Sequence, residues 1–303
     1  MNQEEFKAGN IKSKICGLEK LATFEPVTCR FASYLENNET SLSDLSRWIA
    51  LDPVLTCRIL KLANSPCYGF SGQITTVNLA VVIIGLKALR ELVWSISVMD
   101  QFTDQQKLID QSEVVNLWFH SNYSAIAARY LAELAGYPAA GEAYVAGLLH
   151  DIGNQVLAQQ FPEIYSRVME QSLMKNLPFR VAEKQLLSFG HDEVGAWLGE
   201  AWGFPRMITE TIRNHHAPEE REGDSLLVKI VYLADLLAHS LREKNNPVAE
   251  HWMEISETEI MSRMKKFIPC NGHDLDYYQD HILGEGEKLN EVLQDTTLMF
   301  INA

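Results

Sequence analysis

An imidazole and a carboxylate stand side by side in segment 147–154, where Asp151 directly follows His150. Adjacent helical residues point only about 100° apart, so both side chains can reach one cavity. Imidazole nitrogen and carboxylate oxygen suit zinc, iron, manganese or nickel, and a carboxylate can bridge two ions. A His-Asp pair alone is common by chance, so other residues must support the metal-site interpretation.

Further histidines and one aspartate could complete such a centre: His120, His191, His215, His216 and Asp235. Asp235 lies in the apolar run 230–237, where a carboxylate buried without a partner is costly. Taken singly, His120 or His191 near a helix start is more often an ordinary hydrogen-bonded residue. Adjacent histidines can simply cap a helix C-terminus. The remaining histidines have no such context and stay unassigned: His239, His251, His273 and His281.

Helical spacing of apolar residues positions these candidates and predicts an all-α fold. A helix rich in small residues begins near Leu117 and carries His120 in its first turns, where alanines allow a neighbouring helix to approach closely. A second helix runs from Tyr144 to Leu149, leads into the His-Asp pair and breaks at Gly153.

The N-terminal part is also predicted to be helical. A short helix stops before Pro53, because a residue that precedes proline avoids the α region. Asp52-Pro53 opens the next helix, and a long helix follows from Ile83 through Val93. The polar segment 100–112 lacks a sustained apolar stripe and is the expected joint. We therefore predict an N-terminal helical lobe, residues 1–110, and a metal-binding lobe with C-terminal helices, residues 111–303.

Composition excludes several classes of protein. A formal charge of −14 and a pI near 5.1 disfavour nucleic-acid binding. Five scattered cysteines without CxxC spacing indicate reduced thiols in a cytoplasmic protein. The N-terminus lacks the features of a signal peptide. The most apolar window, 79–98, is interrupted by charges at 87, 90 and 91, so no membrane span is expected.

Three motifs resemble the N-terminal lobe of the HDOD family of bacterial signalling proteins. They are Leu-Asp-Pro-Val-Leu-Thr at 51–56, Leu-Lys-Leu-Ala-Asn-Ser at 60–65 and Ala-Val-Val-Ile-Ile-Gly-Leu at 80–86. The likeness extends from about residue 18 to about residue 216. It implies a helical lobe packed on an HD-domain-like helical bundle, in a protein regarded mostly as a regulator.

The order of the candidate ligands is similar to the pattern of two-metal HD-domain proteins of the HD-GYP group. By that resemblance, one ion would be held by His120, His150, Asp151 and Asp235. Asp151 would bridge to a second ion held by His191, His215 and His216. The resemblance makes His150 and Asp151 the catalytic pair, and the implied cofactor is two divalent transition ions, either iron, manganese, nickel or zinc.

Three positions differ from the motifs of HD-domain hydrolases, and these differences limit the activity and the number of ions that we expect. Active HD phosphohydrolases frequently carry a lysine where this chain has Asn154, the expected substrate-binding residue, whose neutral amide stabilises an oxyanion less well. The Gly-Tyr-Pro signature of cyclic-di-GMP hydrolases is replaced after His216 by Ala-Pro-Glu-Glu, so that activity is disfavoured. Asn116 stands where three-metal members have an acid, which favours two ions at most.

Two hypotheses remain open. The chain is a metal-dependent phosphohydrolase that acts on a phosphoester or nucleotide, or it is a non-enzymatic regulator or scaffold whose metal centre is structural or sensory. In the second case the loop 65–73 would dock a partner. The expected partners are a signalling protein or a phosphorylated small molecule, with neither nucleic acid nor membrane.

Overall fold

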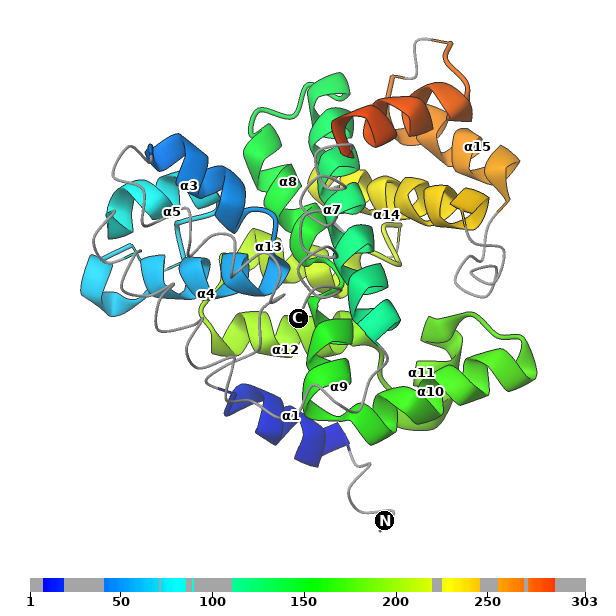
Figure 1. The fold of residues 1–303 in the computed structure, drawn as a ribbon, viewed down its shortest axis with the longest axis horizontal. Coiled ribbons are helices and arrows are strands. Elements are labelled where there is room, and N and C mark those ends of the chain that lie inside the picture. Colours follow the sequence, from blue (N-terminus) through cyan, green and yellow to red (C-terminus); the bar gives the residue numbers. More distant parts are fainter. Residues whose placement is uncertain are drawn as a thin grey trace, which may run out of the picture.

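The computed structural model describes residues 8–18, 41–70, 72–85, 89, 111–219, 225–245, 256–269 and 272–286. Every regular element in these ranges is helical (Figure 1), which confirms the predicted all-α class. In chain order the elements are α1 (Ala8–Cys16), α3 (Leu42–Ile49), α4 (Pro53–Ala63), the 3-10 turn η1 (Pro66–Tyr68), α5 (Val77–Ile84), α7 (Gln111–Leu134), α8 (Ala140–Leu149), α9 (Ile152–Gln160), α10 (Pro162–Lys175), α11 (Phe179–Leu187), α12 (His191–Ala201), α13 (Arg206–Asn214), α14 (Leu226–Asn245) and α15 (Glu257–Phe267). Residues 275–286 are also helical.

Side-chain hydrogen bonds give two of the N-terminal motifs a structural role. Asp52 caps α4, because its Oδ1 accepts a hydrogen bond of 2.9 Å from the backbone nitrogen of Leu55. Asn64 follows α4 and binds the backbone of Ile74 twice, donating from Nδ2 and accepting at Oδ1, both at 2.9 Å. The Leu-Ala-Asn-Ser motif therefore anchors the loop that leads into α5.

The predicted long helix through Val93 is wrong at Gly85. Helix α5 ends at Ile84, and Gly85 has a φ of 79°, a left-handed value that glycine adopts without strain. Apart from residue 89, positions 86–110 lie outside the described residues. The lobe boundary at 110/111 falls at the edge of this gap and stays a prediction.

Helix α7 lies along α8 and α14 in the middle of the molecule (Figure 1). Its small residues allow the close approach that we predicted, because a Cβ on Gly147 of α8 would lie only 2.7 Å from the carbonyl oxygen of Ser124 and 2.8 Å from the Cβ of Ala128. The predicted start of this helix is too late. Since α7 begins at Gln111, His120 lies in its third turn and not in its first turns.

Helices α9 and α12 cross at two glycines. Gly153 lies inside α9, so the predicted helix break at this residue is wrong. A Cβ on Gly153 would collide with the backbone carbonyl oxygen of His191, and one on Gly195 would lie 3.2 Å from the backbone nitrogen of Gly153. Glycine here serves close packing of two backbones, because the contact leaves no room for a side chain.

The N-terminal helices pack on the bundle, as predicted. Side chains of the bundle bind three backbone carbonyl oxygens of the N-terminal part: Trp202 Nε1 donates to Leu18 at 2.8 Å, Tyr144 Oη to Ala50 at 3.1 Å, and Asn122 Nδ2 to Leu51 at 3.0 Å. Thr75 Oγ1 also donates to Glu142 Oε1 at 2.7 Å. Buried apolar side chains from both parts form one connected core. Helices α3, α4 and α5 thus lie on one side of the helical bundle, where α4 contacts α8, and α1 packs on α12 (Figure 1).

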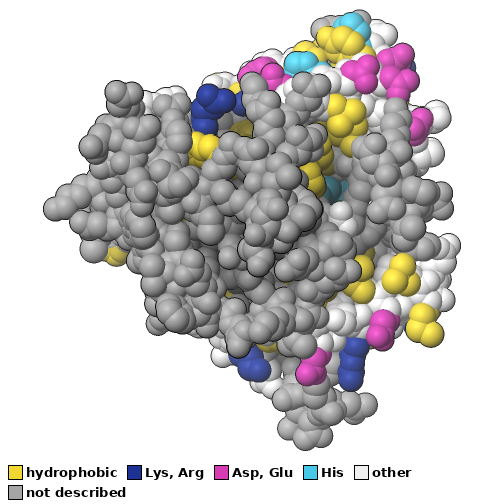
Figure 2. Space-filling view, in the orientation of Figure 1, with side chains coloured by type: hydrophobic (Ala, Val, Ile, Leu, Met, Phe, Trp, Pro, Cys, Tyr) yellow, Lys and Arg dark blue, Asp and Glu magenta, His cyan; other side chains and the backbone are white. Residues whose placement is uncertain are grey.

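The surface agrees with the acidic composition. Figure 2 shows acidic side chains along the edge occupied by the C-terminal helices, in a chain of formal charge −14. Among the helices that the structure describes, none is both long enough and apolar enough to cross a bilayer.

Candidate metal centre

The seven predicted ligands converge on one place, although 115 positions separate the first from the last in the sequence. They come from the middle of α7 (His120), the junction of α8 and α9 (His150, Asp151), the first residue of α12 (His191), the end of α13 (His215, His216) and the middle of α14 (Asp235). All are buried except His216, which is partly exposed. Their potential donor atoms fall into two groups.

The first group consists of His120, His150 and Asp235. The Nε2 atoms of the two histidines are 3.2 Å apart. Each also approaches Asp235 Oδ1, at 3.1 Å for His120 and 3.4 Å for His150. Two imidazoles and one carboxylate therefore point at a common centre.

The second group consists of Asp151, His191, His215 and His216. His191 Nε2 is 3.1 Å from Asp151 Oδ1 and 2.8 Å from His216 Nε2, and His215 Nε2 is 3.6 Å from Asp151 Oδ1. Asp151 also lies 3.5 Å from His120 Nε2 through its other oxygen, Oδ2. Oδ1 is also 3.6 Å from His150 Nε2, so the Asp151 carboxylate lies between the two groups and contacts both, as a bridging carboxylate must.

The spacing of these atoms fits a transition ion. Bonds of about 2.0–2.1 Å in a tetrahedral site put the donor atoms about 3.3–3.4 Å apart. Most of the separations within the two groups lie between 3.1 and 3.6 Å. The nitrogen and oxygen donors also match the ligand preferences of zinc, iron, manganese and nickel.

Hydrogen bonds at Nδ1 turn three of the imidazoles toward the centre. His150 Nδ1–H donates to the carbonyl oxygen of Gly147 at 2.7 Å, and His215 Nδ1–H donates to that of Ile212 at 2.6 Å. These bonds keep a proton on Nδ1 and turn Nε2 inward, so Nε2 is the nitrogen that would bind an ion in place of a proton. Among the described residues, the buried Nε2 atom of His215 has no hydrogen-bond partner. This is expected of a nitrogen that binds a metal ion.

His191 is oriented by a carboxylate that sequence reasoning missed. Glu183 on α11 is fully buried, and its Oε2 accepts from His191 Nδ1 at 2.7 Å and from the His191 backbone nitrogen at 3.2 Å. Burial lowers the pKa of His191, but Glu183 and then Asp151 outweigh it and raise this pKa well above its usual value. No spacing rule links Glu183 to His191, because α11 and α12 are separate helices joined by a turn.

The histidines and aspartates of the centre shift one another's pKa values. Burial lowers the pKa of His120 to about 4, with His239 as the next cause. For His150, burial also lowers the pKa, but Asp151 and Asp235 raise it to about 9. Burial raises the pKa of Asp235, yet His239, His120 and His150 together hold it well below its usual value. Burial also raises the pKa of Asp151, but His150 and His191 hold it well below its usual value. Both aspartates are therefore ionised, as metal ligands must be.

His239 is the second residue that we did not assign. It lies one helical turn after Asp235 on α14, and its Nε2 is 3.1 Å from Asp235 Oδ1. The spacing of four residues could have revealed it, because such residues share a helix face. Of the other unassigned histidines, His273 stacks on Tyr277 and His281 on Tyr130, and His251 lies outside the described residues.

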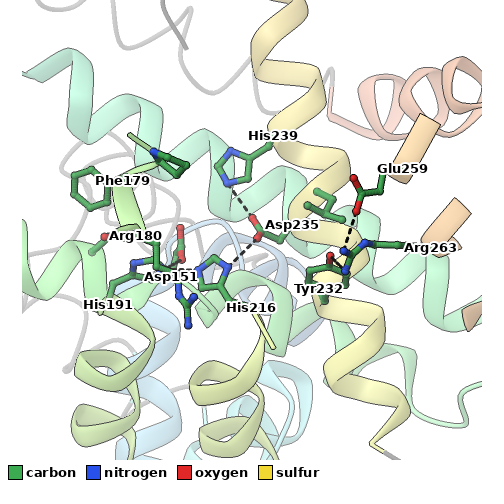
Figure 3. A pocket seen from close by; sticks show the side chains of 13 residues that line it. Asp151, Phe179, Arg180, His191, His216, Tyr232, Asp235, His239, Glu259 and Arg263 are labelled. Carbon is green, nitrogen blue, oxygen red and sulfur yellow. Dashed lines mark hydrogen bonds and ion pairs between the residues drawn. The ribbon is translucent and has the colours of Figure 1, made fainter. Parts of the chain in front are cut away.

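A cavity of about 280 Å³ opens onto the centre (Figure 3). Asp151, His191, His216 and Asp235 lie on its floor, and Asn154 lies beside them. The Asn154 side chain is 1% exposed, and neither its Oδ1 nor its Nδ2 has a hydrogen-bond partner within the described part of the chain. A buried amide without partners is costly, so its position favours contact with a bound ligand or water.

Comparisons with known proteins agree with this fold. The sequence model of the HDOD domain matches residues 21–218, more than half of the chain. An uncharacterized protein of Treponema pallidum is 31% identical over 194 residues, which cover 61% of this chain and 36% of that protein. The chain thus spans about a third of the length of this relative.

Solved structures show the same architecture. The MmoQ response regulator of Methylococcus capsulatus has a TM-score of 0.66 at 23% identity, with 87% of this chain and 99% of that chain covered. An HDOD domain protein of unknown function from Geobacter sulfurreducens is 26% identical, with a TM-score of 0.51 and coverage of 96% and 97%. A virulence factor from Campylobacter jejuni has a TM-score of 0.64 at 18% identity, with coverage of 91% and 98%.

Proposed function

Because this chain belongs to the HDOD family, we propose that it is a signalling protein whose HD-like bundle binds two divalent transition ions and hydrolyses a small phosphoester. The observation that carries the proposal is the position of Asp151 between the two groups of imidazoles, with Oδ2 near His120 and Oδ1 near both His191 and His150. Such a pair of groups is the arrangement of two-metal hydrolytic sites.

The chain's own residues have separate tasks in this proposal. His120, His150 and Asp235 would hold one ion, and His191, His215 and His216 would hold the other, with Asp151 shared between them. Bound divalent ions supply Lewis acidity, which polarises a phosphoester and acidifies water. Asn154 offers its buried amide to a substrate oxygen at the edge of the cavity.

The size of the cavity supports a small substrate. About 280 Å³ lies just below the range of roughly 300–1,000 Å³ that encloses drug-sized ligands. A phosphomonoester or a mononucleotide fits this scale, whereas a cyclic dinucleotide would extend far outside it. The cavity therefore agrees with the absent Gly-Tyr-Pro signature in disfavouring cyclic-di-GMP.

The test combines metal analysis with an activity screen. Purified protein supplied with iron, manganese or zinc is expected to bind close to two ions per chain, measured by elemental analysis. It is then screened with p-nitrophenyl phosphate, bis-p-nitrophenyl phosphate and nucleoside monophosphates. Asp151→Asn is expected to lose metal and at least a hundredfold in rate, since it removes the bridging charge.

The control is His281→Ala, which removes an imidazole that stacks on Tyr130 outside the centre. This variant should keep both metal and rate. Metal-loaded wild-type protein that hydrolyses none of these esters, or an Asp151→Asn protein with unchanged rate, would overturn the enzymatic proposal.

One observation favours the regulator as a second candidate. His120, His150 and Asp235 are at most 4% exposed, and structural metal sites are closed in this way. A regulator of this kind would act by contact, and Phe70 in the loop after η1 exposes 42% of its surface for a partner. A chelator should then unfold the protein and abolish partner binding, without any catalytic activity to lose.

A further inference from the structure

Two arginines flank the candidate metal centre on opposite sides of the same cavity. Figure 3 shows Arg180 beside Asp151 and His191, and Arg263 beside Tyr232 beyond Asp235. The two come from different helices, α11 and α15, and α15 lies outside the region that matches the HDOD domain.

Arg180 is held by an acidic residue and, within the described part of the chain, still has an N–H group without a hydrogen-bond partner. Its Nη2 donates to Asp192 Oδ2 at 2.8 Å, and Asp192 is buried. A guanidinium has five N–H donors, and the Nε of Arg180 has no hydrogen-bond partner among the residues that the structure describes. The side chain is 25% exposed and lines the cavity. It therefore supplies the positive charge that Asn154 lacks.

Arg263 is fixed at the other end of the cavity. Its Nη1 donates to Tyr232 Oη at 2.5 Å and its Nη2 to Glu259 Oε1 at 2.9 Å. The guanidinium also lies 5.5 Å from the centre of the Tyr232 ring. These contacts order a long side chain that is 33% exposed, so less entropy is lost when it binds an anion.

We propose that Arg180 and Arg263 form an anion clamp, in which Arg180 binds the phosphoryl group at the metal centre and Arg263 binds a second anionic group of the same molecule. The substrate class is then a small phosphorylated compound with a carboxylate or a second phosphate. A guanidinium binds either a carboxylate or a phosphate, because its planar N–H donors match the paired oxygens of these anions. This assignment rests on the proposed function and names its substrate class.

The test uses two phosphonates that differ in one group. Both 3-phosphonopropionate and propylphosphonate carry a phosphonate on a three-carbon chain, but only the first has a carboxylate. Their carbon–phosphorus bonds resist phosphoester hydrolysis, so binding is measured without turnover. Manganese-loaded protein is titrated with each compound in a calorimeter.

Wild-type protein should bind 3-phosphonopropionate at least tenfold more tightly than propylphosphonate. Arg263→Gln should abolish this preference and leave propylphosphonate affinity unchanged. Arg180→Gln should weaken both by about ten- to a hundredfold, which is the range for a hydrogen bond to a charged group. Arg213→Gln is the matched control, because Arg213 pairs with Glu200 at 2.7 Å away from the cavity, and it should bind as wild type.

Loss of Arg180 leaves buried Asp192 without its partner, so Arg180→Lys provides a second variant. Lysine keeps the charge beside Asp192 but loses the planar fork, and severalfold weaker binding of both phosphonates is expected. Wild-type protein that binds neither phosphonate, or Arg180 and Arg263 variants that all bind like wild type, would overturn the clamp.

Failure of the clamp and failure of the proposed function give different results. Phosphonate binding that depends on the arginines, in a protein that hydrolyses no ester, overturns the hydrolase and keeps the clamp. Ester hydrolysis that is unaffected by Arg180→Lys and Arg263→Gln keeps the hydrolase and overturns the clamp.

Discussion

Replacing Gly153 by alanine is expected to destabilise both the fold and the metal centre. A Cβ at this position would collide with the backbone carbonyl oxygen of His191 and lie 2.8 Å from the backbone nitrogen of Gly195. Alanine gains about 1 kcal/mol in helix propensity, whereas overpacking costs about 1–3 kcal/mol. The upper value applies, because backbone atoms cannot rotate out of the way. We expect a net loss of about 2 kcal/mol in the free energy of unfolding.

The same substitution should weaken metal binding. Helix α9 begins directly after Asp151, and α12 begins at His191. Their donor atoms, Oδ1 and Nε2, lie 3.1 Å apart. A methyl group that pushes the two helices apart separates these donors, and a displaced ligand costs at least about tenfold in affinity, like the loss of a supporting residue.

Urea unfolding and competition with a chelator of known affinity measure the two effects. Gly284→Ala is the control, because Gly284 is exposed in the helix 275–286 and a Cβ there meets nothing within 4 Å. It gains the same propensity without a clash and should be unchanged or about 1 kcal/mol more stable. If Gly153→Ala unfolds at the same urea concentration as wild type and keeps its metal affinity, the reasoning from the helix crossing is wrong.

Three further outcomes are expected. Glu183→Gln should weaken metal binding about ten- to a hundredfold, since it removes the charge that orients His191. Glu200→Gln, on the exposed surface of α12, is the control. If the two variants have the same metal affinity in competition with a chelator, Glu183 does not have this role. An imidazole binds an ion only when its donor nitrogen is deprotonated, so metal content after dialysis should fall as the pH is lowered from 8 to 5, and constant content would exclude histidine ligands. Iodoacetamide at pH 8 should modify exposed Cys16 but not buried Cys57. Burial, and then Asp52, raise the thiol pKa of Cys57 well above its usual value. Mass spectrometry of the native protein measures both reactions, and equal modification of the two cysteines would contradict the prediction.

Local sequence patterns were sufficient for the helical class, whereas the set of candidate ligands came from the resemblance to two-metal HD-domain proteins. Asp235 could be singled out because an acid in an apolar helix needs a partner, and it is indeed 2% exposed with four imidazoles within 4.0 Å of its carboxylate. The helix boundaries were less predictable. Gly85 ends α5, whereas Gly153 continues α9, because the first adopts a left-handed φ and the second serves a helix crossing.

Residues with no spacing signal could not be found from the sequence. Glu183 and Arg180 lie on α11 and reach His191 and Asp192 only because two helices fold against each other. Arg263 lies 112 positions after Asp151, yet both line one cavity. Such neighbours depend on the packing of separate helices, which short-range periodicity does not encode.

By itself, the sequence determined the kinds of side chain, their order and the helices that carry them, because these follow from local periodicity and from the motifs that resemble the HDOD family. The tertiary structure decided which atoms face one another. Only the convergence of five segments puts Asp151 between two sets of imidazoles, and two further helices, α11 and α15, place a guanidinium on each side of the cavity. Donor separations of a few ångströms arise from helix packing, and that packing decides what the side chains can bind.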